Sequence, residues 1–206
     1  MRTLFRPALL ALCFAFLALS GCGRDSENKS SQSATFRWSA FPVALQMEST
    51  LAANPNAQAD LRDAIAFWEN KAGKPLFQLN AAYPSGQAAF TGNAADPDQI
   101  LANVILEQSP WPFASNVAGQ SIVHAEQNIT QHALMMINPS TVFCTGDCST
   151  SPGDTSRRKL FAHELGHFLG FSHSTDPNDI MFPEIQSGGS LTNVTADTGT
   201  LSQLVD

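Results

Sequence analysis

One segment of this sequence constrains the fold more than any other, because it places three histidines at fixed spacing. It reads His163-Glu164-Leu165-Gly166-His167-Phe168-Leu169-Gly170-Phe171-Ser172-His173. Residues four apart lie on the same face of an α-helix, so His163 and His167 can direct two imidazole nitrogens at one metal ion. Gly170 can take the left-handed conformation that ends a helix, and the chain can then return His173 as a third ligand. The spacing therefore predicts a helix followed by a turn, together holding one zinc ion.

The residue after the first histidine indicates what such a site does. Three protein ligands leave one position of a tetrahedral zinc ion open, which is typical of catalytic zinc, whereas structural zinc has four protein ligands. Glu164 lies beside the ligand row, close enough to accept a proton from a zinc-activated water as general base. A lone histidine on a helix is most often a surface or hydrogen-bonded side chain. Three of the five histidines of the chain fall in this one segment, however, and their joint spacing favours the metal site.

The segment resembles the zinc-binding motif of the metzincin metallopeptidases, and among them most closely that of the matrixins. Ser174 follows the third histidine as it does in matrixins, and Asp179-Ile180-Met181-Phe182-Pro183 resembles their Met-turn. The resemblance implies that Met181 lies under the zinc site as a packing floor and that Pro183 borders the pocket for the residue after the scissile bond. It also implies an α+β domain with a mixed β-sheet, an active-site helix and a final helix near Thr195 to Leu204.

The chain departs from the matrixin pattern in three places. We see no propeptide with a cysteine-switch segment before the domain, so we do not expect a cysteine on the zinc to cause latency. Ile185 stands where matrixins usually have tyrosine, and Tyr83, the one tyrosine of the chain, precedes the motif. The paired histidine and aspartate that begin the second zinc site of matrixins are missing, although His124 and His132 could belong to such a site. Surface or strand-end histidines are expected there ahead of a second, structural zinc. Calcium at the acidic loop 94–98 is a further, weaker expectation.

Hydrophobic periodicity predicts the elements around the motif. Residues 41–47 alternate as a strand, and a helix should run from its cap at Asn54-Pro55 to Gly73. Further strands are predicted at 75–79, 101–106, 121–125 and 133–138. A turn or bulge is expected near Gln127, and the motif helix should span Thr155 to Leu169 with Asp154 or Thr155 as its cap. The order of the strands in the sheet does not follow from these patterns.

The first residues indicate export. Basic residues precede an apolar run from Ala8 to Leu19, which is shorter than the roughly 20 apolar residues that span a bilayer. The run ends in Leu19-Ser20-Gly21-Cys22, which resembles the bacterial lipobox. We therefore expect a lipoprotein signal peptide over 1–21 and a diacylglycerol on Cys22. The alternative is an ordinary signal peptide with an incidental cysteine.

The stretch that follows predicts a flexible tether ahead of a single domain. Residues 22–35 are mostly polar, and 36–206 are within the size of one domain and contain no internal repeat. The expected location is a bacterial cell envelope, lipid-anchored to a membrane or cell surface. Gly23 after the cysteine permits export to an outer membrane, in a cell that has one, under the sorting rule for lipoproteins. The oligomeric state does not follow from the sequence, and a monomer is assumed.

Charge and cysteine content exclude one class of partner and suggest a crosslink. Removal of the signal takes Arg2 and Arg6 from the 11 basic residues, which leaves 9 against 18 acidic ones, a net charge of −9. Nucleic acid is therefore not an expected partner. Cys144 and Cys148 remain as a pair in an oxidising compartment, where a disulfide is expected, and zinc at this pair is the weaker alternative.

These features together predict a zinc-dependent endopeptidase that acts on proteins or peptides, with His163, His167 and His173 as metal ligands and Glu164 as the catalytic base. One alternative is a surface lipoprotein that keeps the zinc site for binding and has lost catalysis, although such a protein has no need of a carboxylate at 164. Another is a zinc hydrolase that acts on a non-protein amide. The preferred substrate sequence does not follow from these residues.

Overall fold

The computed structural model describes most of the chain from Phe36 onward. The described residues are 36–84, 87–144, 146–150, 154–185, 188–192 and 195–196. The predicted signal peptide 1–21, Cys22 and the tether 22–35 lie outside them, as does the predicted final helix beyond Ala196. Within the described residues, no helix is both long and apolar enough to cross a membrane.

The main sheet has five strands and is mixed, as predicted. Its strands are β1 (Val43–Met47), β2 (Phe77–Leu79), β3 (Val104–Glu107), β4 (Gly119–Glu126) and β5 (Ile129–Ile137). Their order is β2-β1-β3-β5-β4, with β1, β2, β3 and β5 parallel and β4 antiparallel to β5. β4 and β5 form a hairpin whose turn residues, Gln127 and Asn128, both have positive φ. β4 is thus the outermost strand on its side of the sheet.

The first long helix, α2 (Pro55–Ala72), begins and ends where the sequence predicts. The side chain of Asn54 accepts hydrogen bonds from the backbone N–H groups of Asn56 and Ala57, at 3.0 and 3.2 Å. Gly73 ends the helix with a φ of 68°, a conformation that glycine adopts at little cost. A short helix not predicted from the sequence, α1 (Ser49–Ala52), precedes α2 and is capped by the carboxylate of Glu48.

The motif helix, α3 (Arg157–Phe168), begins later than predicted. Its cap is Ser156, whose Oγ accepts a hydrogen bond from the Lys159 backbone N–H at 3.3 Å, so the prediction of Asp154 or Thr155 was wrong. The reason is a pairing that the local sequence does not reveal. Thr155–Ser156 form strand β7, which pairs in parallel with β6 (Phe143–Cys144) and keeps Thr155 extended. Cys144 is also joined to Cys148 by a disulfide.

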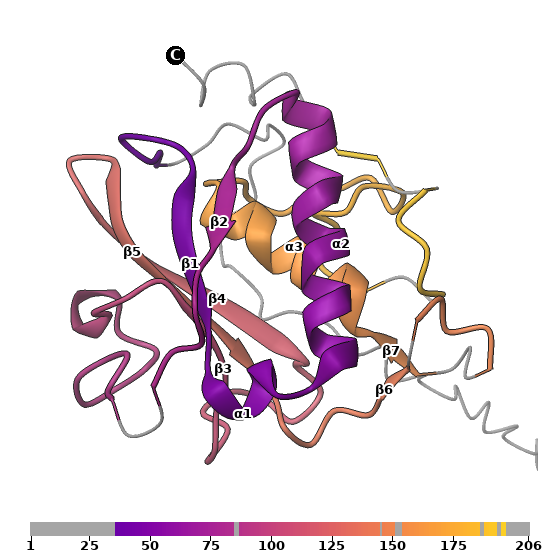
Figure 1. Ribbon diagram of the computed structural model, residues 1–206, viewed down its shortest axis with the longest axis horizontal. Helices are drawn as coiled ribbons and strands as arrows, with labels where there is room; N and C mark the ends of the chain where they lie inside the picture. The colour runs from indigo at the N-terminus through magenta and orange to yellow at the C-terminus, as the bar shows by residue number, and fades with distance from the viewer. Residues whose placement is uncertain are drawn as a thin grey trace, which may run out of the picture.

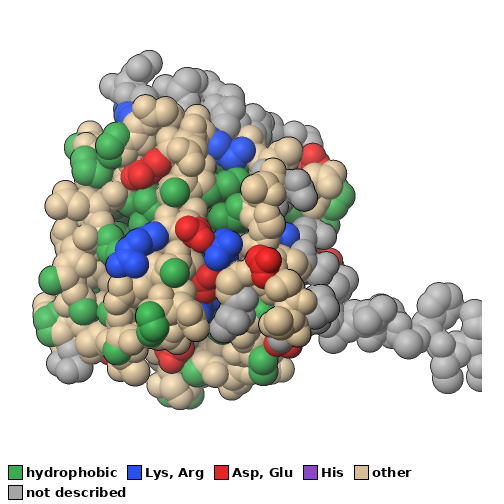
Figure 2. Space-filling view, turned by 45° about the vertical axis from the view of Figure 1, so that its right-hand side comes forward, with side chains coloured by type: hydrophobic (Ala, Val, Ile, Leu, Met, Phe, Trp, Pro, Cys, Tyr) green, Lys and Arg blue, Asp and Glu red, His purple; other side chains and the backbone are tan. Residues whose placement is uncertain are grey.

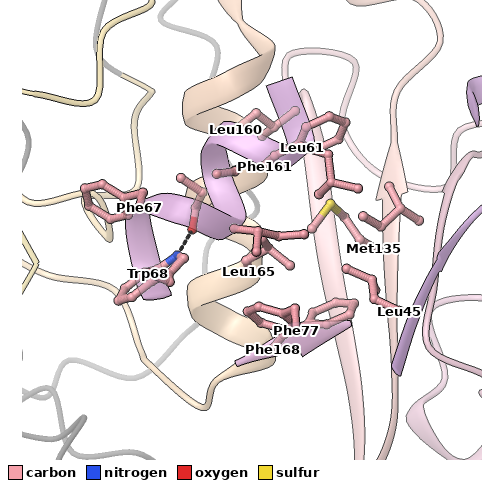
Figure 3. Close-up of a cluster of buried hydrophobic side chains, with 14 of the residues drawn as sticks. Leu45, Leu61, Phe67, Trp68, Phe77, Met135, Leu160, Phe161, Leu165 and Phe168 are labelled. Carbon is pink, nitrogen blue, oxygen red and sulfur yellow. Dashed lines mark hydrogen bonds between the residues drawn. The ribbon is translucent and has the colours of Figure 1, made fainter. Parts of the chain in front are cut away.

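The two long helices cover the same face of the sheet, and α3 is buried in the core beneath α2 (Figure 1). Trp68 of α2 and Leu165 and Phe168 of α3 are fully buried with Leu45 and Met135 of the sheet, as Figure 3 shows. The sequence predicts an apolar face for α3, whereas all of its residues except Arg158 are buried. The ligand helix is therefore fixed on nearly every side by packing.

The opposite face of the sheet carries a second, smaller apolar cluster. Alternate residues of β3 and β5 divide between the two clusters, so Ile105 and Met135 face the helices while Val104 and Leu134 face away. This alternation follows from the two-residue period of a strand. Tyr83 belongs to the second cluster and donates its hydroxyl hydrogen bond to the Ala88 carbonyl at 2.9 Å. It therefore takes no part in the histidine site.

Ion pairs join α2 to the start of α3. Arg157 Nε lies 3.0 Å from Asp60 Oδ2 with both side chains buried, and Arg158 Nε lies 2.9 Å from Asp63 Oδ2. Burial raises the pKa of the Asp60 carboxyl, although Arg157 and Arg158 oppose that shift. Figure 2 shows acidic and basic side chains close together on one face of the molecule.

Candidate active site

Three histidines meet at the C-terminal end of α3. His163 and His167 are one helical turn apart and are buried, with exposed fractions of 0% and 9%. The helix ends at Phe168, and Gly170 has a φ of 95°, so the chain turns there and returns His173 to the other two. The ring centroids are 4.8, 5.2 and 4.9 Å apart. Within the described part of the chain, this is the one group of three or more ligand-type side chains that could hold a metal ion.

Backbone carbonyls fix which nitrogen of each helical histidine faces the centre. His163 Nδ1 lies 2.7 Å from the Ile180 carbonyl oxygen, and His167 Nδ1 lies 2.8 Å from that of Phe171. A carbonyl oxygen can only accept, so each Nδ1 donates a proton and each Nε2 presents a lone pair. His163 Nε2 is buried and has no hydrogen-bond partner among the described residues. A buried nitrogen in that state is costly unless it binds a ligand.

One nitrogen–nitrogen distance at this centre matches that between two ligands of a zinc ion. His167 Nε2 lies 3.3 Å from His173 Nε2, and the three ligand atoms all lie within 4.8 Å of one another. Two nitrogens bound to tetrahedral zinc at about 2.0–2.1 Å are roughly 3.3–3.4 Å apart. The hydrogen bonds from Nδ1 to carbonyl oxygens are also the usual outer contacts of metal-bound histidine. The donor set, the spacing and the fixed tautomers therefore suit zinc.

The pKa of His163 predicts a pH dependence for the metal-free protein. Burial and the neighbouring rings of His167 and His173 lower this pKa well below its ordinary value of 6.5, and the hydrogen bond to Ile180 opposes the shift. Below about pH 6.5 the unfolded chain therefore binds a proton at His163, whereas the folded protein keeps this side chain neutral. Acidification below that pH thus favours the unfolded state, and above it this group has no such effect. We expect the free energy of unfolding to fall by up to about 1.4 kcal/mol per pH unit from this group.

The measurement is urea unfolding with a chelator present, repeated from about pH 8 to pH 5, for the parent and for His163→Gln. The variant should lose stability less steeply on acidification, because it lacks the histidine that takes up a proton when the protein unfolds. Equal slopes for the two proteins would contradict the assignment of a depressed pKa to His163.

The segment predicted to be a Met-turn, 179–183, lies against the ligand helix at Met181. Met181 is buried, and a β-carbon at Gly166 would overlap its Sδ atom, so the helix needs glycine where the two segments touch. The Met181 backbone N–H donates to Asp179 Oδ1 at 2.8 Å. The Ser174 N–H donates to the Met181 carbonyl at 2.9 Å. This turn therefore supports the ligand helix by packing and fixes the residue next to His173.

Glu164 lies in the same helix, directly after His163 in sequence, and its backbone contacts the edge strand. Glu164 is fully buried, and its backbone carbonyl accepts a hydrogen bond from Ser121 Oγ of β4 at 3.1 Å. This bond ties β4 to α3 at the candidate base. A cavity of about 270 Å³ lies here, between β4 and the end of α3, and His167 is among its lining residues.

Two supports of the site are not assigned to it by the sequence. Trp68 of α2 donates its indole N–H to the Ala162 carbonyl of α3 at 2.7 Å, the dashed line in Figure 3. Its ring stacks on Phe171, with centroids 5.2 Å apart, and the Phe171 carbonyl is the partner of His167. Periodicity predicts Trp68 only as a core residue of its helix. The contact with Phe171 depends on tertiary structure and leaves no local signal.

The remaining predicted site residues lie apart from the histidine group or stay untested. Pro183 is partly exposed two residues after Met181, and its place in a substrate pocket remains a prediction. Ile185 packs against the main core. Cys144 and Cys148 form the disulfide described above rather than a metal site.

The candidates for a second metal site are only partly together. His124 and His132 face each other across β4 and β5. His124 Nδ1 is 3.3 Å from Asp98 Oδ1, and its Nε2 is 3.6 Å from Glu126 Oε1. Burial and the charge of His124 lower the pKa of His132. A second zinc, or calcium in the loop 94–98, remains a prediction.

Comparison with known proteins bears on the whole domain. A family model described as matrixin matches residues 43–204. The matched range contains the five-stranded sheet, both long helices, the three histidines and the predicted Met-turn. A search of curated proteins gave no significant match. Because the family model covers well over half of the chain, and the histidine group that it includes fits zinc, the chain belongs to the matrixin family of metallopeptidases.

Proposed function

We propose that this protein is a zinc-dependent endopeptidase in which Glu164 is the general base. The observation that carries the proposal is the convergence of His163, His167 and His173, with ligand atoms within 4.8 Å, on a helix that also holds a buried Glu164. Three histidines leave one coordination position for the reaction. Membership of the matrixin family supports a peptide bond as the bond that is cleaved.

The chain's own residues account for the proton transfers. Bound at the three histidines, zinc would supply a Lewis acid at its open position. Glu164 accepts one proton from water as the water oxygen attacks the carbonyl carbon. When the carbon–nitrogen bond breaks, Glu164 gives that proton to the leaving amine. His163 and His167 would not compete for it, because backbone carbonyls fix their protons on Nδ1 and leave the Nε2 lone pairs to the metal.

The edge strand β4 is the proposed guide for the substrate. It is the outermost strand of the sheet, and Ser121 ties it to the backbone of Glu164. An extended peptide can add to the open edge of a strand through backbone hydrogen bonds, with little dependence on its side chains. A peptide held along β4 in this way passes next to His167, which lines the adjoining cavity. This arrangement suits cleavage within a chain.

The proposed place of action is the surface of a bacterial membrane. The support is in the sequence, where the lipobox-like run ends at Cys22 and 22–35 are mostly polar. A lipid on Cys22 would place the domain within the length of this tether from the membrane. Metabolic labelling with a fatty acid analogue, compared between the parent and Cys22→Ser, would show whether the lipid is attached.

Metal removal tests the peptidase activity directly. We expect the purified full-length chain to hold about one zinc and to cleave an unfolded protein such as reduced casein. A chelator should abolish cleavage, and added zinc should restore it, because the three histidines hold the ion that the reaction needs. The measurements are metal content by mass spectrometry and fragment formation by gel. Zinc-loaded protein that cleaves no peptide bond would favour a binding role or a non-protein amide substrate.

A further inference from the structure

The cavity beside His167 is lined in part by residues outside the zinc motif. One side of the cavity is β4 at 120–123, and another is the turn 170–172 that leads to His173. Phe36 and Pro97 also line it. Among the described residues that line the cavity, none is aspartate, glutamate, lysine or arginine. Its volume of about 270 Å³ is enough for a large side chain.

Phe36 is held in place by the two residues that follow it. Arg37 forms a parallel bridge with Ile129 at the start of β5, through backbone hydrogen bonds of 3.0 and 2.8 Å. Trp38 donates its indole N–H to the Phe168 carbonyl at the end of α3, at 2.7 Å, and packs against the main core. The segment is thus fixed at both the hairpin and the ligand helix. Phe36 is therefore a built part of the cavity wall.

We infer that Phe36 and Pro97 form a subsite that selects an apolar side chain of the substrate on one side of the scissile bond. The inference rests on the proposed peptidase function and adds a specificity residue to it. The cavity adjoins the histidine group, because His167 lines the cavity and also belongs to that group. Burial of a large aliphatic or aromatic side chain against Phe36 is favourable, whereas a carboxylate there would lose hydration with no lysine or arginine among the described lining residues to pair with.

The position of Phe36 gives the inference a second consequence. Phe36 directly follows 22–35, the stretch predicted to tether the domain. The segment that joins the domain to its proposed anchor is therefore also part of the substrate cleft. Substrate preference should depend on this junction even though it lies more than 100 residues before the zinc motif in sequence.

The test compares side-chain preference in the zinc-loaded full-length protein and in Phe36→Ala. The substrates are peptides that differ in one residue, with Leu, Ala or Asp placed in turn at each position flanking the scissile bond. At one such position, the parent should prefer Leu over Ala by about tenfold or more in kcat/KM, since a few buried methylene groups are worth at least that much. In Phe36→Ala this preference should fall to about threefold or less, while the peptides with Ala are cleaved nearly as before.

Two further variants keep the test decisive. Phe36→Trp places a larger side chain in the cavity wall and should move the preference toward smaller substrate side chains. It tests the inference even if Phe36→Ala does not fold. Val142→Ala removes an exposed side chain that does not line the cavity and should leave all preferences unchanged. If the parent cleaves peptides and the Phe36 variants keep its preferences, this inference is overturned and the peptidase function stands. Zinc-loaded parent that cleaves none of the peptides overturns both.

Discussion

Replacement of Glu164 by glutamine should lower kcat for peptide cleavage by about 10²- to 10⁴-fold and leave zinc bound. This is the range that a positioned general base contributes. Glutamine keeps the size and the hydrogen-bonding oxygen of glutamate but cannot take up a proton at neutral pH. It suits a residue with no exposed surface, because a smaller side chain would leave a cavity next to the ligands. The measurements are steady-state kinetics on a peptide and zinc content of the same sample.

A matched substitution separates catalysis from loss of charge. Glu107 lies at the end of β3 and is exposed, so Glu107→Gln removes one negative charge without disturbing a buried side chain. It should keep parental kcat and KM. If Glu164→Gln holds one zinc and retains activity within a few-fold of the parent, Glu164 is not the base and another group must accept the proton. If it loses zinc as well as activity, its role is in the metal site itself.

The parts of the fold that follow from the sequence are those fixed by local chemistry. Asn54, Pro55 and Gly73 carry the start and end signals of α2, and the structure has both ends where those signals stand. The alternating residues of β1 are buried in turn, and Gly170 has the positive φ that returns the chain to His173. Each of these features depends on residues close together in the sequence, through capping, glycine conformation or the two-residue period of a strand.

What the sequence does not reveal depends on contacts between distant segments. The cap of α3 is Ser156 because β7 pairs with β6, and that pairing is set by residues some ten positions earlier in the chain. The carbonyls that orient His163 and His167 belong to Ile180 and Phe171, and a backbone oxygen has no side-chain signature. Phe36 lines the cavity beside His167 only in the folded chain. These are the elements that complete the site around its motif.

Truncation of Trp68 should produce the largest loss of stability among the residues that support the site. Trp68→Ala removes a fully buried ring and its hydrogen bond to the Ala162 carbonyl, and we expect a loss of about 3–5 kcal/mol in the free energy of unfolding. The stack on Phe171 disappears with it, so the turn that carries the partner carbonyl of His167 loses a support. Zinc should bind about 10- to 100-fold more weakly, the usual effect of disturbing the outer contacts of a metal ligand.

Trp111 provides the matched control, because it makes the same kinds of contact away from the zinc site. Its indole N–H donates to the Ala114 carbonyl at 3.1 Å, and its ring packs on the edge of Phe113. It is only partly buried, against the second cluster. Trp111→Ala should therefore cost less stability and leave zinc affinity unchanged. Urea unfolding and competition with a zinc-binding dye give the two quantities, and equal zinc affinity in both variants would show that Trp68 stabilises the core without positioning the ligands.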